Sequence, residues 1–259
     1  MQAAQKIAVA GATGRLGHHL VDILKSRGRE VVPMSRATGV DVITGNGLAE
    51  ALVGVECVID AATGPSPEQE PATAFFTTAA RNLHEAGRRA GVERMITVSI
   101  IGTDRFRTGY GAAKLAHEQA ALTGPIPARV VRAAQFHEFV AQLLEWGTQG
   151  EIAFVPTMRT QLVAARSVAE VLADLVTDER RFSSSGGGRS FLEVAGPRAE
   201  NLVDMANLLV ARRGGASKVE GVSDPADPLT ELYESGALLP GPDAILTGPT
   251  FEEWLDATS

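Results

Sequence analysis

The sequence predicts one α/β domain with a doubly wound, mostly parallel sheet and a small C-terminal lobe. Two observations support this: short apolar segments alternate with helical patterns along the first 150 residues, and a glycine-rich turn follows the first apolar segment. The 259 residues, 44% of them hydrophobic, suffice for one large domain with a small appendage. We therefore predict a ligand-binding core at residues 1–150 and substrate-lobe elements at 151–259, packed on the same domain.

The individual elements follow from the spacing of apolar residues and from glycine and proline breaks. In the core we expect strands at Lys6–Ala10, Val31–Met34, Val40–Ile43, Cys57–Ala62, Met95–Ile100 and Ala128–Ala133. We expect helices at Leu48–Val53, Ala72–Ala90 and Gly111–Leu122, and a first helix in which Leu16, Leu20, Ile23 and Leu24 recur until Gly28 ends the pattern. Beyond residue 150 we expect strands at Thr160–Ala164 and Ser190–Val194, a loop at Ser183–Gly188, and helices at Ser167–Val176, Asn201–Arg213 and Thr250–Ala257. Pro33 lacks the amide hydrogen of a central strand, so we expect it to mark where the second strand ends.

Composition excludes several classes of function. The net charge is -7 and no basic block is present, which argues against nucleic acid or an anionic membrane as the main partner. No uncharged apolar stretch reaches the length of a membrane helix, and the N-terminus lacks a signal-peptide pattern, so we expect a cytoplasmic protein. The single cysteine, Cys57, lies in an apolar run and is expected to be a small buried hydrophobe.

Two kinds of catalytic site are also not supported. The five histidines show no metal-ligand spacing, so we expect no metal site. No G-x-S-x-G pattern is present, which argues against a serine hydrolase.

The segment Gly11-Ala-Thr-Gly-Arg-Leu-Gly17 has the spacing and position of a dinucleotide-binding turn. Gly11 permits a tight turn, Gly14 lets the backbone approach a pyrophosphate, and Gly17 allows the helix to pack closely on the sheet. The phosphates would then meet the amide groups at the start of the first helix. The alternative is a glycine-rich turn with no ligand.

The end of the second strand indicates which dinucleotide is preferred. NAD-binding proteins usually place an acidic residue there, about 20 residues beyond the glycines, but this sequence reads Pro-Met-Ser35-Arg36. The guanidinium groups of Arg36 and Arg15 and the hydroxyl of Ser35 suit a 2'-phosphate, so we expect NADP(H) to be preferred, with NAD(H) possible. Arg36 could instead be a solvated strand end. Asp41 is a candidate adenine contact or a plain turn residue.

Tyr110-Gly-Ala-Ala-Lys114 indicates acid/base chemistry. The chain has two tyrosines and four lysines (Lys6, Lys25, Lys114 and Lys218), so this pairing is rarely met by chance. On a helix the two side chains share one face, and a nearby ammonium would lower the pKa of the phenol. The tyrosine would then exchange a proton with a carbonyl oxygen, which Ser99 at the preceding strand end would orient. Otherwise Tyr110 is an exposed helix start and Lys114 a solvated charge.

Together the glycine turn, the strand-end Ser99 and Tyr110-x-x-x-Lys114 resemble the short-chain dehydrogenase/reductase superfamily. The segment Ala133–Phe139 and the ending Gly-Pro-Thr-Phe-Glu-Glu-Trp254 resemble its atypical NmrA-like or nucleotide-sugar-epimerase-like branch. The resemblance implies a Rossmann-type fold that binds NAD(P), with Ser99 orienting, Tyr110 as acid/base and Lys114 also holding the nicotinamide ribose. Ser99 precedes Tyr110 by 11 residues, which is shorter than usual in the classical branch.

We therefore expect an NAD(P)H-dependent oxidoreductase that acts on a small carbonyl or quinone-like molecule. The alternatives are a nucleotide-sugar-type epimerase or dehydratase, and a non-catalytic NmrA-like sensor of NADP. The residues expected to bind cofactor are Gly11, Thr13, Gly14, Arg15, Leu16, Gly17, Ser35, Arg36, Asp41, Ala61, Ala62, Thr63 and Lys114. Gln135, Phe136 and His137 follow a strand's carboxyl end and would line the substrate pocket or serve only in packing. The sequence leaves the oligomeric state open.

Overall fold

A computed structural model describes residues 5–177 and 191–258, except 217, 225 and 228. Its internal contacts divide the chain into two compact units, neither of which is one continuous stretch. The first unit comprises Met1–Ser99, Arg107–Arg132 and Ala169–Leu192, and the second comprises Ile100–Phe106, Ala133–Val168 and Glu193–Ser259. The loop expected at Ser183–Gly188 and the first residue of the strand expected at Ser190–Val194 lie outside the described residues.

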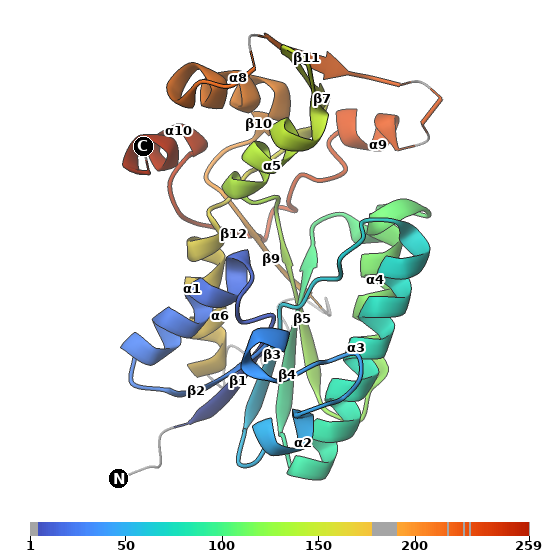
Figure 1. Ribbon diagram of the computed structural model, residues 1–259, viewed down its shortest axis with the longest axis vertical. Helices are drawn as coiled ribbons and strands as arrows, with labels where there is room; N and C mark the ends of the chain where they lie inside the picture. The colour runs from blue at the N-terminus through green and yellow to red at the C-terminus, as the bar shows by residue number, and fades with distance from the viewer. Residues whose placement is uncertain (1–4, 178–190, 217, 225, 228, 259) are drawn as a thin grey trace. The chain divides into compact units, whose positions relative to one another are not determined.

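A seven-stranded sheet of Rossmann type organises the fold, with the order β12-β9-β5-β4-β3-β1-β2 (Figure 1). The strands are β1 (Lys6–Ala10), β2 (Glu30–Met34), β3 (Cys57–Asp60), β4 (Arg94–Ile100), β5 (Ala128–Ala133), β9 (Phe191–Ala195) and β12 (Ile245–Leu246). β1 runs parallel to both β2 and β3, and β3 runs parallel to β4. The chain passes from β1 to β2 in one direction and then crosses to β3 on the other side of β1. This reversal creates a switch point at the carboxyl ends of β1 and β3, where open α/β sheets bind ligands.

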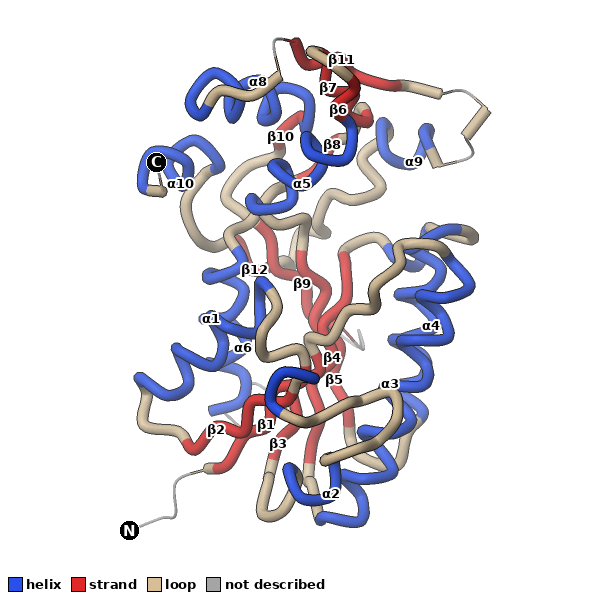
Figure 2. Tube along the Cα trace, viewed as in Figure 1, coloured by secondary structure: helices blue, strands red, loops and turns tan. Residues whose placement is uncertain are grey.

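Helices cover both faces of the strands in the first unit (Figure 2). The longer helices are α1 (Arg15–Ser26), α3 (Gln69–Ala90), α4 (Gly109–Thr123) and α6 (Ala165–Thr177), with the short α2 (Leu48–Ala51) and the 3-10 turns η1 (Arg36–Thr38) and η2 (Thr103–Arg105) between them. α1 and α6 lie on one face and are joined by an ion pair of 2.8 Å between Arg27 and Asp174. α3 and α4 lie on the other face, where the buried His84 of α3 hydrogen-bonds the Ala121 carbonyl of α4 at 2.9 Å.

The core of the first unit is formed by apolar strands and by the apolar faces of the helices that pack on them. All four residues of β3 are buried, including Cys57, so the prediction of a small buried hydrophobe is confirmed. Burial raises the pKa of the Cys57 thiol to about 12, which keeps it protonated and unreactive at neutral pH.

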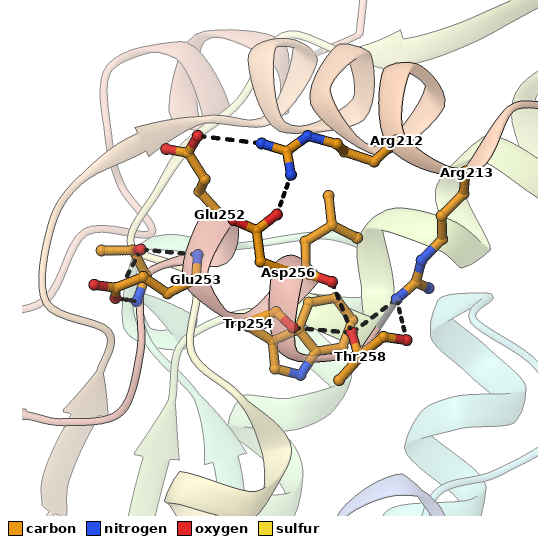
Figure 3. A network of polar contacts seen from close by, with 9 residues as sticks. Arg212, Arg213, Glu252, Glu253, Trp254, Asp256 and Thr258 are labelled. Carbon is orange, nitrogen blue, oxygen red and sulfur yellow. Dashed lines mark hydrogen bonds and ion pairs between the residues drawn. The ribbon is translucent and has the colours of Figure 1, made fainter.

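The second unit has its own apolar core and two small sheets of order β11-β7-β6 and β10-β8. Its strands are β6 (Thr148–Gln149), β7 (Ile152–Pro156), β8 (Arg159–Thr160), β10 (Glu200–Asn201) and β11 (Lys218–Val222), and its helices α5 (His137–Gly147), α8 (Leu202–Arg213), α9 (Thr230–Glu234) and α10 (Phe251–Ala257). Arg212 and Arg213 reach from the end of α8 to the side chains of α10 and its cap (Figure 3). Arg212 pairs with Asp256, and Arg213 donates to the Thr258 hydroxyl at 2.8 Å. These contacts fasten the last helix to α8.

Three predicted local features are wrong. Val40–Ile43 is a turn and not a strand, because Val40 and Val42 insert their side chains into the core from a loop. Only Thr160 of the strand expected at Thr160–Ala164 belongs to a strand, β8. Pro33 does not end the second strand: it pairs with Val9 one residue before β2 ends, and β2 tolerates it because it is an edge strand.

Candidate cofactor and catalytic site

The glycine turn between β1 and α1 is folded tightly onto its neighbours. The amide groups of Gly11 and Ala12 donate to the Met34 carbonyl at the end of β2, at 3.0 and 3.2 Å. Gly11 has a φ of +75°, and an added Cβ there would lie 2.6 Å from the Ala61 carbonyl oxygen. A Cβ at Gly17 would lie 2.1 Å from the Gly11 carbonyl oxygen. The turn and the helix start therefore leave no space for side chains at these two glycines.

The same turn leaves an open cradle where a diphosphate would lie. Gly14 is the N-cap of α1, and a Cβ added to it would meet only the Gly11 carbonyl oxygen, at 3.2 Å. The residues around it, Thr13 and Arg15, are exposed, whereas Leu16 is buried against the core. The first amide groups of a helix lack acceptors within the helix and carry the positive end of its dipole. The residues present at this turn therefore fit a dinucleotide's phosphates.

The end of β2 carries a hydroxyl and a guanidinium and no carboxylate. Ser35 is half-buried and caps η1, where its amide donates to the Thr38 hydroxyl at 2.9 Å. The Thr38 hydroxyl also lies 2.9 Å from the Pro33 carbonyl oxygen. This turn holds the backbone at residue 35 and presents the side chain of Arg36 to solvent.

The loop after η1 is stabilised by hydrogen bonds within the loop and by hydrogen bonds from α3. Asp41 accepts hydrogen bonds from the amides of Ile43, at 2.7 Å, and Thr44. The side-chain amide of Asn82 on α3 donates to the carbonyl oxygens of Val42 and Ile43, at 2.9 and 2.8 Å. Asp41 therefore serves as a turn residue in the structure, and its role as an adenine contact stays a prediction.

The residues after β3 lie against the glycine turn. The Ala61 amide donates to the Ala10 carbonyl at 3.1 Å, and Asp60 accepts from the Ala62 amide at 3.1 Å. Ala62 is buried and Thr63 is exposed. The predicted cofactor residues at 61–63 thus lie at the carboxyl end of the strand next to β1, on the edge of the sheet that carries the glycine turn.

Ser99, near the end of β4, is 1% exposed, and its hydroxyl has no hydrogen-bond partner among the residues that the structure describes. An unpaired buried hydroxyl is costly, and a ligand oxygen that accepted its hydrogen bond would remove that cost. This group is therefore available to orient an oxygen.

Tyr110 is half-buried in the first turn of α4, and its ring meets the edge of Phe76 at a centroid distance of 5.8 Å. Burial raises the pKa of its phenol above the ordinary value of 10.0. The lowering that we expected from the neighbouring ammonium is not found. The phenol is consequently neutral over the physiological pH range.

Lys114 explains why that expectation is wrong. Its ammonium group donates to the Val98 carbonyl at 2.7 Å, bonds to Nδ1 of His117 at 2.9 Å and lies 4.2 Å from the centroid of the Phe76 ring. The side chain is buried, and burial lowers its pKa from 10.5 to about 8, although Asp60 and Glu118 act in the opposite direction. The lysine therefore directs its hydrogen bonds to the interior of the first unit.

Asp60 and His117 are two polar residues of this region that the sequence analysis missed. Nε2 of His117 lies 2.9 Å from Oδ2 of Asp60, and both side chains are 1% exposed. Burial raises the pKa of Asp60, but the hydrogen bonds from His117 and the Ala62 amide and the charge of Lys114 outweigh it and bring that pKa below its ordinary value. The signal was the position of His117, one turn beyond Lys114 on the same face of α4.

The three predicted substrate-pocket residues belong to the second unit. Gln135 is half-buried and its side-chain oxygen accepts from the Thr160 hydroxyl. Phe136 is half-buried and forms a backbone bridge with Val163. His137 is fully buried between Phe251 and Trp254, and Nε2 donates to the Pro249 carbonyl at 3.1 Å. A contact with substrate stays a prediction for all three.

The buried position of His137 predicts a loss of stability in acid. Burial lowers its pKa from 6.5 to about 4, so the unfolded chain binds a proton before the folded one does. We expect stability to fall by about 3 kcal/mol as the pH drops from about 6.5 to about 4. Comparing the free energy of unfolding at pH 7.5 and 4.5 in the wild type and in His137→Phe measures this loss, which the variant should lack.

The exposed His18 provides the control, because His18→Gln should keep the full acid sensitivity. Equal pH dependence in the wild type and in His137→Phe would contradict the assignment.

Comparison with known proteins identifies the family. The sequence pattern described as NAD(P)H-binding matches residues 11–179, which is more than half of the chain. The chain belongs to this NAD(P)H-binding family. The Rossmann-type fold and the nicotinamide dinucleotide expected from the glycine turn are thereby confirmed.

Solved structures with the same fold include nucleotide-sugar enzymes. A dTDP-4-dehydrorhamnose reductase from Bacillus anthracis in complex with NADP has a TM-score of 0.73 at 17% identity, and the match covers 98% of each chain. A UDP-N-acetylglucosamine 4-epimerase from Bacillus cereus has a TM-score of 0.68 at 18% identity, covering 98% of this chain and 95% of that one. MoeE5 in complex with UDP-glucuronic acid and NAD has a TM-score of 0.65 at 19% identity, covering 98% and 100%. At these identities the likeness shows a shared fold.

No curated protein matches the sequence significantly. Within the described ranges, no helix is long and apolar enough to cross a membrane. The same residues contain no group of three or more histidine, cysteine or acidic side chains arranged to hold a metal ion.

Proposed function

We propose that this protein is an NADPH-dependent reductase of a small carbonyl compound, in which Tyr110 donates the proton. The observation that carries the proposal is the buried Ser99 hydroxyl, which has no hydrogen-bond partner among the described residues and lies in the same unit as Tyr110 and the glycine turn. A phenol that stays protonated suits carbonyl reduction, because the oxygen gains a proton as the carbon gains a hydride. Alcohol oxidation would need the phenolate, whose formation burial opposes.

In this proposal the chain's own residues bind and orient the reactants. The bound dinucleotide supplies a hydride. Backbone amides at the start of α1 bind its phosphates, with Gly14 leaving the space open. The Ser99 hydroxyl donates a hydrogen bond to the carbonyl oxygen, which removes the cost of leaving that buried group unpaired. Tyr110 donates a proton to the same oxygen, and Lys114 places a positive charge at the end of β4 beside Ser99.

The preference for NADPH depends on Arg36. Its exposed guanidinium at the end of β2 can hold a 2'-phosphate through paired hydrogen bonds, and no carboxylate in this turn replaces that contact for NADH. We expect Arg36→Ala to weaken NADPH binding by about tenfold or more, with NADH affinity unchanged. Fluorescence titration with each dinucleotide measures both constants.

Arg27 supplies the matched control for that titration. It ends the same helix that the glycine turn begins, but it pairs with Asp174, so Arg27→Ala should change neither affinity. An equal loss of NADPH and NADH affinity in Arg36→Ala would show that the residue supports the turn and does not select the cofactor.

Transfer of deuterium tests the proposed reaction. The purified chain is mixed with NADPH carrying deuterium at C4 and with a panel of aldehydes, ketones, quinones and nucleotide-linked keto sugars. A reductase gives a product that contains deuterium together with an equal amount of NADP. A nucleotide-sugar epimerase or dehydratase, which the shared fold with the 4-epimerase keeps open, would instead convert a nucleotide sugar with bound oxidised dinucleotide and leave the amount of oxidised dinucleotide unchanged, so a parallel reaction with NADP and nucleotide sugars is included. A sensor binds NADPH and transfers nothing.

A further inference from the structure

Lys114, His117 and Asp60 form one continuous chain of hydrogen bonds inside the first unit. The ammonium of Lys114 lies 2.9 Å from Nδ1 of His117, and Nε2 of His117 lies 2.9 Å from Oδ2 of Asp60. Asp60 is on β3, whereas the other two residues are on α4. These hydrogen bonds therefore connect α4, the candidate catalytic helix, to β3, whose carboxyl end adjoins the glycine turn.

The Lys114 ammonium and the Asp60 carboxylate, which bind the two ring nitrogens of His117, determine which nitrogen carries the proton. An ammonium group only donates hydrogen bonds, so Nδ1 of His117 presents its lone pair to Lys114. The proton is then on Nε2, which donates to the Asp60 carboxylate, while the other oxygen of Asp60 accepts from the Ala62 amide. His117 is therefore a neutral imidazole with one hydrogen bond to a cation and one to an anion. Burial and the charge of Lys114 both lower its pKa, in agreement with this state.

The surroundings leave Lys114 one orientation. Val98 takes one of its three donor directions, His117 a second, and the ring of Phe76 lies across the ammonium at 4.2 Å. The same ring stacks on His117 at a centroid distance of 4.7 Å. Cation and imidazole are therefore held together by one aromatic side chain of α3.

Asp60 is the acid that is connected to this lysine by hydrogen bonds. Glu118 also faces Lys114 from α4, but its carboxylate pairs with Arg132 of β5 at 2.8 Å. The charge of Asp60 also acts on His84 of α3, but His84 hydrogen-bonds the Ala121 carbonyl and is not part of the hydrogen-bonded series Lys114–His117–Asp60. Asp60 is therefore the carboxylate whose charge offsets that of Lys114 through the histidine.

We propose that His117 and Asp60 are positioning residues for Lys114, which hold its ammonium group at the Val98 carbonyl beside Ser99 and keep that group charged. The proposal rests on the proposed function in one respect, because Lys114 belongs to the catalytic machinery described there. Its physical basis is the cost of an isolated charge away from water. Asp60 offsets that cost, and His117 transmits the effect by fixing its own tautomer.

Titration of Lys114 in the complete, cofactor-free chain tests this proposal without any substrate. The protein has four lysines, so labelling lysine with carbon-13 at Cε gives four NMR signals, and Lys114→Met identifies the one from Lys114. Asp60→Asn keeps an oxygen that accepts from His117 and removes the charge. We expect the titration midpoint of Lys114, about 8 in the wild type, to fall by about one pH unit or more in this variant.

His84→Gln is the matched control, because it replaces another buried histidine of this unit that lies near the same carboxylate. We expect it to leave the midpoint of Lys114 unchanged. An unchanged midpoint in Asp60→Asn, or an equal fall in His84→Gln, would overturn the proposal.

A measurement on the wild type covers the case in which Asp60→Asn does not fold. Nitrogen-15 NMR of the histidine rings distinguishes the two neutral tautomers and the charged form. We expect His117 to carry its proton on Nε2 and to stay neutral at pH 7. A proton on Nδ1, or a charged ring, would refute the arrangement.

The failure of this proposal and the failure of the proposed function give different results. If Asp60→Asn shifts Lys114 but no carbonyl compound is reduced, the positioning role stands and the reaction is wrong. If reduction occurs and depends on Tyr110 while Lys114 does not respond to Asp60, the reaction stands and the positioning role is wrong.

Discussion

Replacing Tyr110 by phenylalanine should slow carbonyl reduction by about 10²- to 10⁴-fold, the usual contribution of a positioned proton donor. The variant loses only the hydroxyl, and the ring can keep its contact of 5.8 Å with Phe76, so the fold and the affinity for NADPH should stay close to wild type. Single-turnover oxidation of bound NADPH by a carbonyl substrate measures the loss. Turnover equal to wild type would remove Tyr110 from the mechanism.

The pH dependence of the same reaction provides a second check. Because burial raises the pKa of Tyr110 above 10.0, the phenol stays protonated through neutral and mildly alkaline pH. Reduction that depends on this proton should therefore show no loss from Tyr110 ionisation below pH 10. The reverse oxidation should accelerate as the pH rises toward that pKa. Tyr233 offers a control, since it is the other tyrosine and lies in the second unit, so Tyr233→Phe should retain both profiles.

Substitution of Gly14 by alanine should abolish most cofactor binding and leave the fold intact. The backbone at Gly14 has a φ of -78°, which alanine adopts without strain, and the new methyl group would make one tight contact, 3.2 Å from the Gly11 carbonyl oxygen, which a shift of a few tenths of an ångström relieves. It would, however, occupy the space that we assign to the pyrophosphate, so we expect NADPH affinity to fall on the order of tenfold to a hundredfold. Isothermal titration with NADPH and thermal unfolding without it measure the two properties separately.

Gly17→Ala supplies the contrasting case three residues later. There the added methyl would lie 2.1 Å from the Gly11 carbonyl oxygen, so α1 must move away from the turn. We expect stability to fall by about 3 kcal/mol as well as cofactor affinity. If Gly14→Ala instead lost stability and kept its affinity, the pyrophosphate would lie elsewhere.

The glycine turn and the parallel sheet could be predicted because their signals are local. Gly11, Gly14 and Gly17 lie within seven residues, and the apolar runs around them need only strand or helix periodicity to be recognised. Such patterns fail where an apolar residue belongs to the core without belonging to a strand. Val40 and Val42 show this, since they pack into the core from a turn.

The candidate site was predicted only as far as its motif extends. Tyr110 and Lys114 are one helical turn apart, but Lys114 hydrogen-bonds Val98, 16 residues earlier in the sequence. Its other partner, His117, is bound to Asp60, which precedes that histidine by 57 residues. Such contacts depend on how α4 packs on β3 and β4, which no local pattern specifies. The pKa of Tyr110 was predicted in the wrong direction for the same reason, because the ammonium is bound inward.

If Asp41 contacts the adenine as predicted, Asn82 has a consequence for how fast the cofactor binds. Its two hydrogen bonds from α3 fix the loop that contains Asp41 before any ligand arrives. A loop that is already ordered loses little conformational entropy when a ligand settles on it, so association need not wait for a slow rearrangement. Weakening this attachment, as in Asn82→Ala, should therefore lower the association rate for the dinucleotide more than it raises the dissociation rate.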